Sequence, residues 1–126
     1  MPGLKDWLKK ASSDLKLATK SIGDDETLDP AVYLAHQCAE KCLKAIFIFN
    51  KETVPKTHNL ILLLNDCIKF NQEFGLLQKE CKFLNPYSVA SRYPNDSFRV
   101  NQKHLIKALT MANKIFDFVK GKISKQ

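Results

Sequence analysis

Apolar residues recur every three or four positions along most of this chain, which is the period of an amphipathic helix. The first such stretch, Leu4–Ile22, places its apolar residues on one stripe and its lysines on the opposite side. Gly23 is expected to end this helix, because glycine readily adopts the left-handed conformation found at helix C-termini. The predicted inward-facing residues are Leu4, Trp7, Leu8, Ala11, Leu15, Ala18 and Ile22.

A second helix is predicted from Asp29 to Asn50. Asp29 suits the N-cap, and Pro30 suits the first helical position, where its missing N–H costs nothing. The second half, Leu43–Phe49, is apolar nearly all round apart from Lys44. A helix with this pattern is expected at the centre of the fold, in contact with several neighbours.

The rest of the chain predicts three more helices and one irregular segment. The helices are expected over Asn59–Phe70, over Gly75–Leu84, and from a start within residues 97–101 to near the C-terminus. Prolines mark Asn85–Ser97 as irregular. No run alternates apolar and polar residues long enough for a strand, so the pattern predicts an all-α, up-and-down bundle of four to five helices.

Length and composition fit this picture. A chain of 126 residues suits one domain, residues 1–126, and four glycines and five prolines are too few for a turn-rich β-fold. The first ten residues already include Lys5, Asp6, Lys9 and Lys10, and they lack the apolar core of a secretory signal. The longest apolar run, Ala45–Phe49, is too short to cross a bilayer. The expected compartment is the cytoplasm, with no membrane association.

The net charge of +7 favours anionic partners such as RNA, a nucleotide or an acidic protein. Surface lysines that only keep the protein dispersed would give the same charge.

The four cysteines lack the CxxC spacing of redox and zinc motifs. They are Cys38, Cys42, Cys67 and Cys81. Because Cys38 and Cys42 lie one helical turn apart in an apolar stretch, buried reduced thiols are expected. A zinc site would need His36 or His58 to converge on them, which is the less favoured interpretation. Glycine-rich phosphate loops and HExxH motifs are missing too, so we expect no metal or other cofactor.

Arginine usage gives the sharpest clue to chemistry. Lys and Arg number twenty, yet only Arg92 and Arg99 are arginine, and both fall in one short stretch. A guanidinium offers a rigid fork of donors that fits a phosphate, which an ammonium does not. The alternative is that each arginine ties the loop to a carboxylate or a helix C-terminus.

His104 follows Arg99 at a spacing that places both near the start of the last helix. An imidazole beside a guanidinium at the positive end of a helix can hold a phosphate and move a proton near neutral pH. The alternative is an ordinary surface histidine. Lys41 and Lys44 of the second helix would extend a basic groove, although a solvated helix face explains them equally well.

The two remaining histidines are interpreted as structural. His36, in an apolar helix, is expected to be packed or hydrogen-bonded, and His58 is expected to help cap the third helix.

Four motifs, in order, extend over nearly the whole chain. Trp7–Leu15 matches an opening Trp, Ala and Asp-Leu pattern, and residues 35–45 match Gln-x-Ala-Glu-Lys-x-Leu-Lys-Ala. Pro55–Leu60 matches Pro-x-Thr-His-x-Leu, and Tyr87 precedes an Arg-Tyr-Pro segment at residues 92–94. Together they resemble the HEPN family (higher eukaryotes and prokaryotes nucleotide-binding), in its Arg-Tyr-Pro type.

This resemblance implies a helical bundle that dimerises and works beside a minimal nucleotidyltransferase, as in toxin–antitoxin modules. Many members are metal-independent ribonucleases, whose motif is Arg, a polar residue, and a His four to six residues on. Two copies form one composite site across the dimer. The resemblance thus implies catalytic roles for Arg99 and His104, with Arg92 and Tyr93 as further candidates. The candidate phosphate-binding residues are then Arg92 and Tyr93, together with Lys41 and Lys44 of the basic groove.

The sequence departs from that motif at two points. Val100 stands where a polar residue is expected, and no tyrosine follows His104 to serve as an AMP acceptor, as one does in some relatives. The alternative is a non-catalytic nucleotide-binding module that partners a nucleotidyltransferase, or a structural dimer without a ligand.

Overall fold

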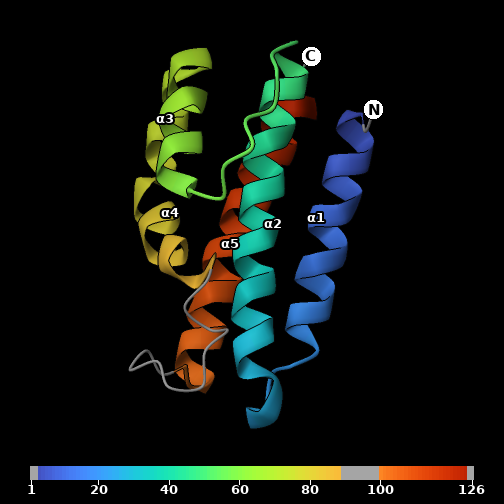
Figure 1. The fold of residues 1–126 in the computed structure, drawn as a ribbon, viewed down its shortest axis with the longest axis vertical. Helices are drawn as coiled ribbons and strands as arrows, with labels where there is room; N and C mark the ends of the chain where they lie inside the picture. Colours follow the sequence, from blue (N-terminus) through green and yellow to red (C-terminus); the bar gives the residue numbers. More distant parts are fainter. Residues whose placement is uncertain (1–2, 89–99, 125–126) are drawn as a thin grey trace.

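Five α-helices, one of them central, run up and down in this computed structural model, which describes residues 3–88 and 100–124 (Figure 1). Three short 3₁₀ turns join them, and the described residues contain no strand. The helices are α1 (Leu4–Thr19), α2 (Leu28–Phe49), α3 (Leu60–Phe70), α4 (Gln78–Leu84) and α5 (Gln102–Ser124). The turns are η1 (Asp25–Thr27), η2 (Gln72–Leu77) and η3 (Asn85–Ser88). The all-α bundle predicted from the sequence is confirmed.

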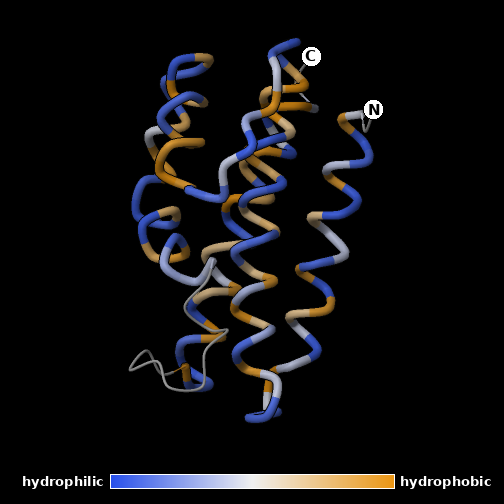
Figure 2. The backbone as a smooth tube through the Cα atoms, in the orientation of Figure 1, coloured by the Kyte–Doolittle hydropathy of each residue, from blue (hydrophilic) through white to orange (hydrophobic). Residues whose placement is uncertain are grey.

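The central helix is α2, as its nearly all-round apolar pattern predicted. It lies between α1 on one side and the α3–α4 pair on the other, and it packs against α5 (Figure 1). Most of the buried residues are apolar, and hydrophobic positions recur along the sides of the helices that face one another (Figure 2). No helix among residues 3–88 and 100–124 has the length and apolar character needed to span a bilayer.

The connection from α1 to α2 differs from the prediction in detail. Gly23 does stop the first stretch and has a positive φ of 88°. The helix itself already ends at Thr19, however, and Ile22 is half exposed rather than in the core. The side chain of Asp24 caps η1 by accepting from the N–H of Glu26 at 3.0 Å, so α2 begins at Leu28 and the predicted cap at Asp29 is wrong.

The start of α3 agrees with the prediction. The Asn59 side chain accepts hydrogen bonds from the N–H groups of Ile61 and Leu62, which satisfies two donors of the first turn. The Asn85 side chain accepts a third, from the N–H of Leu60 at 2.8 Å, and so ties η3 to this turn. The predicted fourth helix, Gly75–Leu84, is instead the turn η2 followed by α4.

All four cysteines are buried and free, as expected. Burial raises the pKa of the Cys67 and Cys81 thiols to about 12, and it holds the pKa of Cys42 well above its ordinary value. Cys67 Sγ lies 3.6 Å from the carbonyl oxygen of Leu43 and donates to it. The thiols therefore behave as small core side chains.

Candidate functional site

The six residues predicted to handle phosphate do not lie together among the described residues. Arg92, Tyr93 and Arg99 fall outside the part of the chain that the structure describes. His104 lies at the start of α5, whereas Lys41 and Lys44 lie in the second half of α2.

His104 belongs to a reciprocal cap at the start of α5. Its backbone N–H donates to the side-chain oxygen of Asn101 at 2.9 Å, and its ring Nδ1 accepts from the backbone N–H of Asn101 at 3.2 Å. This is the arrangement of a capping box, with Asn101 as the cap and His104 in the third helical position. The cap therefore fixes the orientation of the imidazole.

The cap also selects the tautomer of neutral His104. Because Nδ1 accepts a hydrogen bond, it carries no proton in this arrangement, and the ring proton lies on Nε2. No partner of Nε2 occurs among the described residues, and His104 is partly exposed. The ring thus offers an N–H donor at the positive end of α5.

Gln102 joins this helix start to the loop between α1 and α2. Its side-chain oxygen accepts from the N–H of Gly23 at 2.9 Å, and its side-chain nitrogen donates to Asp25 at 2.8 Å. The position of His104 is therefore set from both sides, by its own cap and by the neighbouring loop.

Lys41 is paired with a carboxylate on the neighbouring helix α1. Its Nζ forms an ion pair with Asp14 of α1, and both side chains are mostly shielded from solvent. It is thus neither a solvated residue nor a free cation lining a groove.

Lys44 lies in a buried cluster centred on Glu40. Its Nζ donates to one carboxylate oxygen of Glu40 at 2.9 Å, and His58 Nδ1 donates to the other at 2.9 Å. Glu40 and Lys44 are only 4% and 6% exposed. The solvated helix face offered as one explanation of Lys44 is therefore wrong, as is the capping role expected of His58.

His36 contacts the same loop through the backbone of His58. Its Nε2 lies 3.1 Å from the backbone oxygen of His58, and its Nδ1 lies 3.3 Å from the side-chain oxygen of Gln37. Burial lowers the pKa of His36, partly offset by these contacts and by nearby Glu40. His36 is thus packed and hydrogen-bonded, as the sequence predicted.

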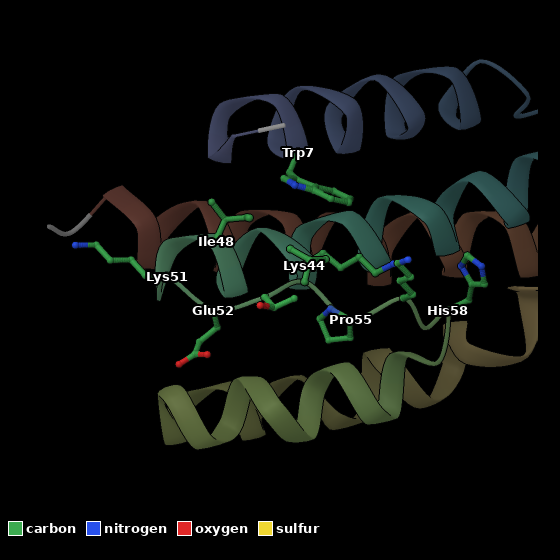
Figure 3. A pocket seen from close by; sticks show the side chains of 10 residues that line it. Trp7, Lys44, Ile48, Lys51, Glu52, Pro55 and His58 are labelled. Carbon is green, nitrogen blue, oxygen red and sulfur yellow. The ribbon is translucent and has the colours of Figure 1, made fainter. Parts of the chain in front are cut away.

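Lys44 and His58 also line a pocket of about 720 Å³ between α1, α2 and the 50–58 segment (Figure 3). In Figure 3, the indole of Trp7 extends from α1 toward α2. Apolar side chains form much of the wall, and three lysines and one glutamate supply its charge. The lining residues are Trp7, Lys44, Ile48, Lys51, Glu52, Thr53, Val54, Pro55, Lys56 and His58.

Comparison with known proteins assigns the family. The family model described as "HEPN domain" matches residues 4–122, nearly the whole chain. The chain belongs to the HEPN domain family.

Solved structures agree with this assignment. TT1696 from Thermus thermophilus is 27% identical with a TM-score of 0.81, over 97% of this chain and 99% of that one. ST0689, described as an archaeal HEPN homologue, is 25% identical with a TM-score of 0.79, over 98% and 99% of the two chains. A search of functionally curated proteins finds no match.

In this HEPN domain, the α5 start and the pocket lie at opposite ends of α1. Gln102 bonds to Gly23, just beyond the C-terminal end of α1, whereas Trp7 is in its first turn. Twelve residues separate Trp7 from Thr19, and at 1.5 Å per residue they span about 18 Å. The two regions are therefore separate sites.

The pocket was missed because its residues are distant in sequence. Trp7 was predicted to face the core, and no pattern in the sequence singled out Lys51 or Lys56. The available signal was the match at Pro55–Leu60, which showed that this loop belongs to a pattern.

Proposed function

We propose that this HEPN domain binds the phosphate of a nucleotide or RNA at the start of α5, with His104 as a hydrogen-bond donor and Arg99 as its cationic partner. The observation that carries the proposal is the reciprocal cap between Asn101 and His104, which leaves the Nε2 proton of the ring available. Arg92 and Tyr93 are proposed to add contacts from the same stretch of sequence.

The cap favours binding over base catalysis. A neutral imidazole with its proton on Nε2 donates to a phosphate oxygen, and the dipole of α5 favours the same negative charge. A general base needs the lone pair on Nε2 instead. To provide it, the ring proton would have to move to Nδ1, which would break the hydrogen bond from Asn101.

A metal-independent ribonuclease is the second candidate. It is favoured by the five-residue step from Arg99 to His104 and by the unpaired Nε2 among the described residues. In this chemistry, the ribose 2′-oxygen loses its proton and bonds to phosphorus, and the leaving 5′-oxygen gains a proton as its bond breaks. His104 would move one of these protons, and Arg99 would stabilise charge on the phosphate.

Assembly with other chains belongs to the same proposal. HEPN proteins often dimerise. We propose a homodimer that pairs with a minimal nucleotidyltransferase in a toxin–antitoxin-like module, acting in the cytoplasm. Two copies would bring two α5 starts to one RNA.

Replacing His104 by Gln separates the two candidates. Glutamine at this position keeps an acceptor for the cap and an N–H donor for phosphate, but it cannot shuttle a proton near neutral pH. We expect H104Q to bind fluorescently labelled RNA within about threefold of wild type, and R99A to bind about tenfold more weakly, as for loss of one charge-assisted bond. Anisotropy titrations measure both.

Cleavage is measured in parallel with labelled RNA in EDTA. If wild type cleaves RNA and H104Q does so about a hundredfold more slowly, the protein is a ribonuclease and the proposal of binding without catalysis is wrong. If R99A and H104A both bind RNA as tightly as wild type, the site at the start of α5 is wrong.

A further inference from the structure

We infer that the pocket between α1, α2 and the 50–58 segment is a docking site for an acidic segment of a partner protein, which inserts aliphatic side chains flanked by carboxylates. This inference goes beyond the proposed phosphate contact at the start of α5 and does not depend on it. It rests on the walls of the pocket, the charge of its rim and one strained lysine at its edge.

The walls of the pocket are apolar, and the donors on its floor already have a partner. Apolar surface comes from three separate elements, through Trp7, Ile48, Val54 and Pro55. The Nε1 atom of Trp7 is buried, so the indole presents ring carbons rather than a donor to an occupant. Lys44 and His58 both donate to Glu40. Such a wall favours aliphatic side chains, which need no directed hydrogen bonds.

The size and course of the pocket suit an extended segment. Its volume of about 720 Å³ is that of a ligand site rather than of a packing defect. In Figure 3, the labelled side chains that line it extend from Lys51 at one end to His58 at the other, along the last turns of α2 and the loop that follows. A recess of this kind can receive successive side chains of one chain segment.

The charge of the rim favours an acidic occupant. Lys51 and Lys56 are exposed, and their ammonium groups have no carboxylate partner among residues 3–88 and 100–124. Lys10 is also exposed and lies on the same side of α1 as Trp7, which precedes it by three residues. Glu52 is the one acid among the lining residues that the structure describes. Because the lysines are spread along the rim, they suit several carboxylates along a segment.

Lys51 occupies a strained backbone position at the edge of the pocket. It has a φ of 59° and directly follows the last turns of α2. Its N–H donates to the carbonyl of Ile48 at 3.0 Å, and the N–H of Glu52 donates to the carbonyl of Phe47 at 2.8 Å. In this Schellman arrangement the left-handed residue is usually glycine, because a Cβ is disfavoured there. A lysine at this position lowers stability, so its side chain indicates a role in binding.

The test uses the single tryptophan of the chain as its reporter. An acetylated and amidated hexapeptide, with two leucines between pairs of glutamates, is titrated against Trp7 emission. We expect a saturable change below about 1 mM. In one control peptide glutamines replace the glutamates, and in another alanines replace the leucines. Each control is expected to bind at least about tenfold more weakly, because it lacks one half of the recognised chemistry.

Charge variants tie the signal to the pocket. K56E reverses one exposed charge of the rim and is expected to weaken binding of the glutamate peptide about fivefold. K79E makes the same change at an exposed position of α4 and is expected to leave peptide binding unchanged. H104A should also bind the peptide as wild type does, which keeps this test apart from the proposed RNA site.

Replacing Lys51 by Gly separates a binding role from a structural one. K51G is expected to weaken peptide binding about threefold and to raise the urea concentration at the midpoint of unfolding, because glycine relieves the backbone strain. Damage to the fold would instead lower that midpoint together with the affinity.

Four results would overturn the inference. The first is the lack of any saturable change in Trp7 emission, up to about 5 mM peptide, with a folded wild-type protein. The second is equal peptide binding by wild type and K56E. The third is displacement of the peptide by a short oligoadenylate, which would assign the pocket to a nucleic acid. The fourth is a dimer in sedimentation that K56E dissociates, which would assign the pocket to a second copy of this chain.

Discussion

At the residue scale, the most informative side chains are buried polar groups of α2. Lys44 donates a hydrogen bond to one carboxylate oxygen of Glu40, one helical turn away, and His58 donates to the other oxygen. A buried charge without such partners is strongly destabilising. Their spacing in the sequence is also that of an ordinary exposed ion pair, so only the tertiary structure distinguishes the two cases.

His36 makes the stability of the fold depend on pH. Burial is the main cause that lowers its pKa below the ordinary 6.5, so the unfolded chain binds this proton more readily than the folded one. His36 therefore has no effect on stability well above pH 6.5. As the pH falls below 6.5, toward the lower pKa that His36 has in the folded protein, the free energy of unfolding decreases.

Replacing His36 by Gln tests this linkage, because the Gln side-chain nitrogen can still donate to the carbonyl of His58. We expect H36Q to lose less stability than wild type between about pH 7.5 and 5.5 in urea denaturation. The difference between the two proteins cancels the remaining titrating groups. Parallel losses over this range would show that His36 is not the group responsible.

At the element scale, periodicity located the helices well, and their boundaries less well. The buried residues of α3 and α5 recur at the three- and four-residue spacing that predicted helices, because burial of those faces holds the bundle together. The errors concentrate where a 3₁₀ turn precedes a helix. Asp24 and Asn71 cap such turns. A cap of this kind is a single local hydrogen bond, so it does not change the spacing of apolar residues from which the helices were predicted.

Asn59 is the cap whose loss should matter most in this region. It accepts from two N–H groups of α3 and also from the Asn85 side chain, so N59A frees donors on both sides. We expect a loss of about 1–2 kcal/mol in the free energy of unfolding, measured by urea denaturation.

Asn71 gives the matched control, because its side chain accepts a single exposed N–H, from Glu73. N71A should therefore cost clearly less than N59A. Equal losses in the two variants would mean that the link to Asn85 adds nothing to stability.

At the scale of the whole molecule, the sequence predicted the family and fold but only part of the candidate site. His104 could be singled out because its spacing from Arg99 is local. The pocket could not be found this way, since Trp7, Lys44 and Lys56 lie more than ten residues from one another and meet only when α1 and the loop pack on α2. The burial of Lys44 could not be predicted from the sequence either, because it depends on the loop that brings His58 close to α2.

The net charge of +7 predicts how RNA binding at the proposed site responds to salt. RNA bound at the α5 start would contact several phosphates along the protein surface and release several counterions, so its affinity should fall steeply with salt, at a slope of about −0.7 per phosphate neutralised. We therefore expect RNA affinity to fall by at least about tenfold between about 50 and 200 mM KCl, for three or more contacts. Anisotropy titrations with labelled RNA at several salt concentrations measure this slope. An affinity that stays constant over this range would show that phosphate contacts do not carry the binding.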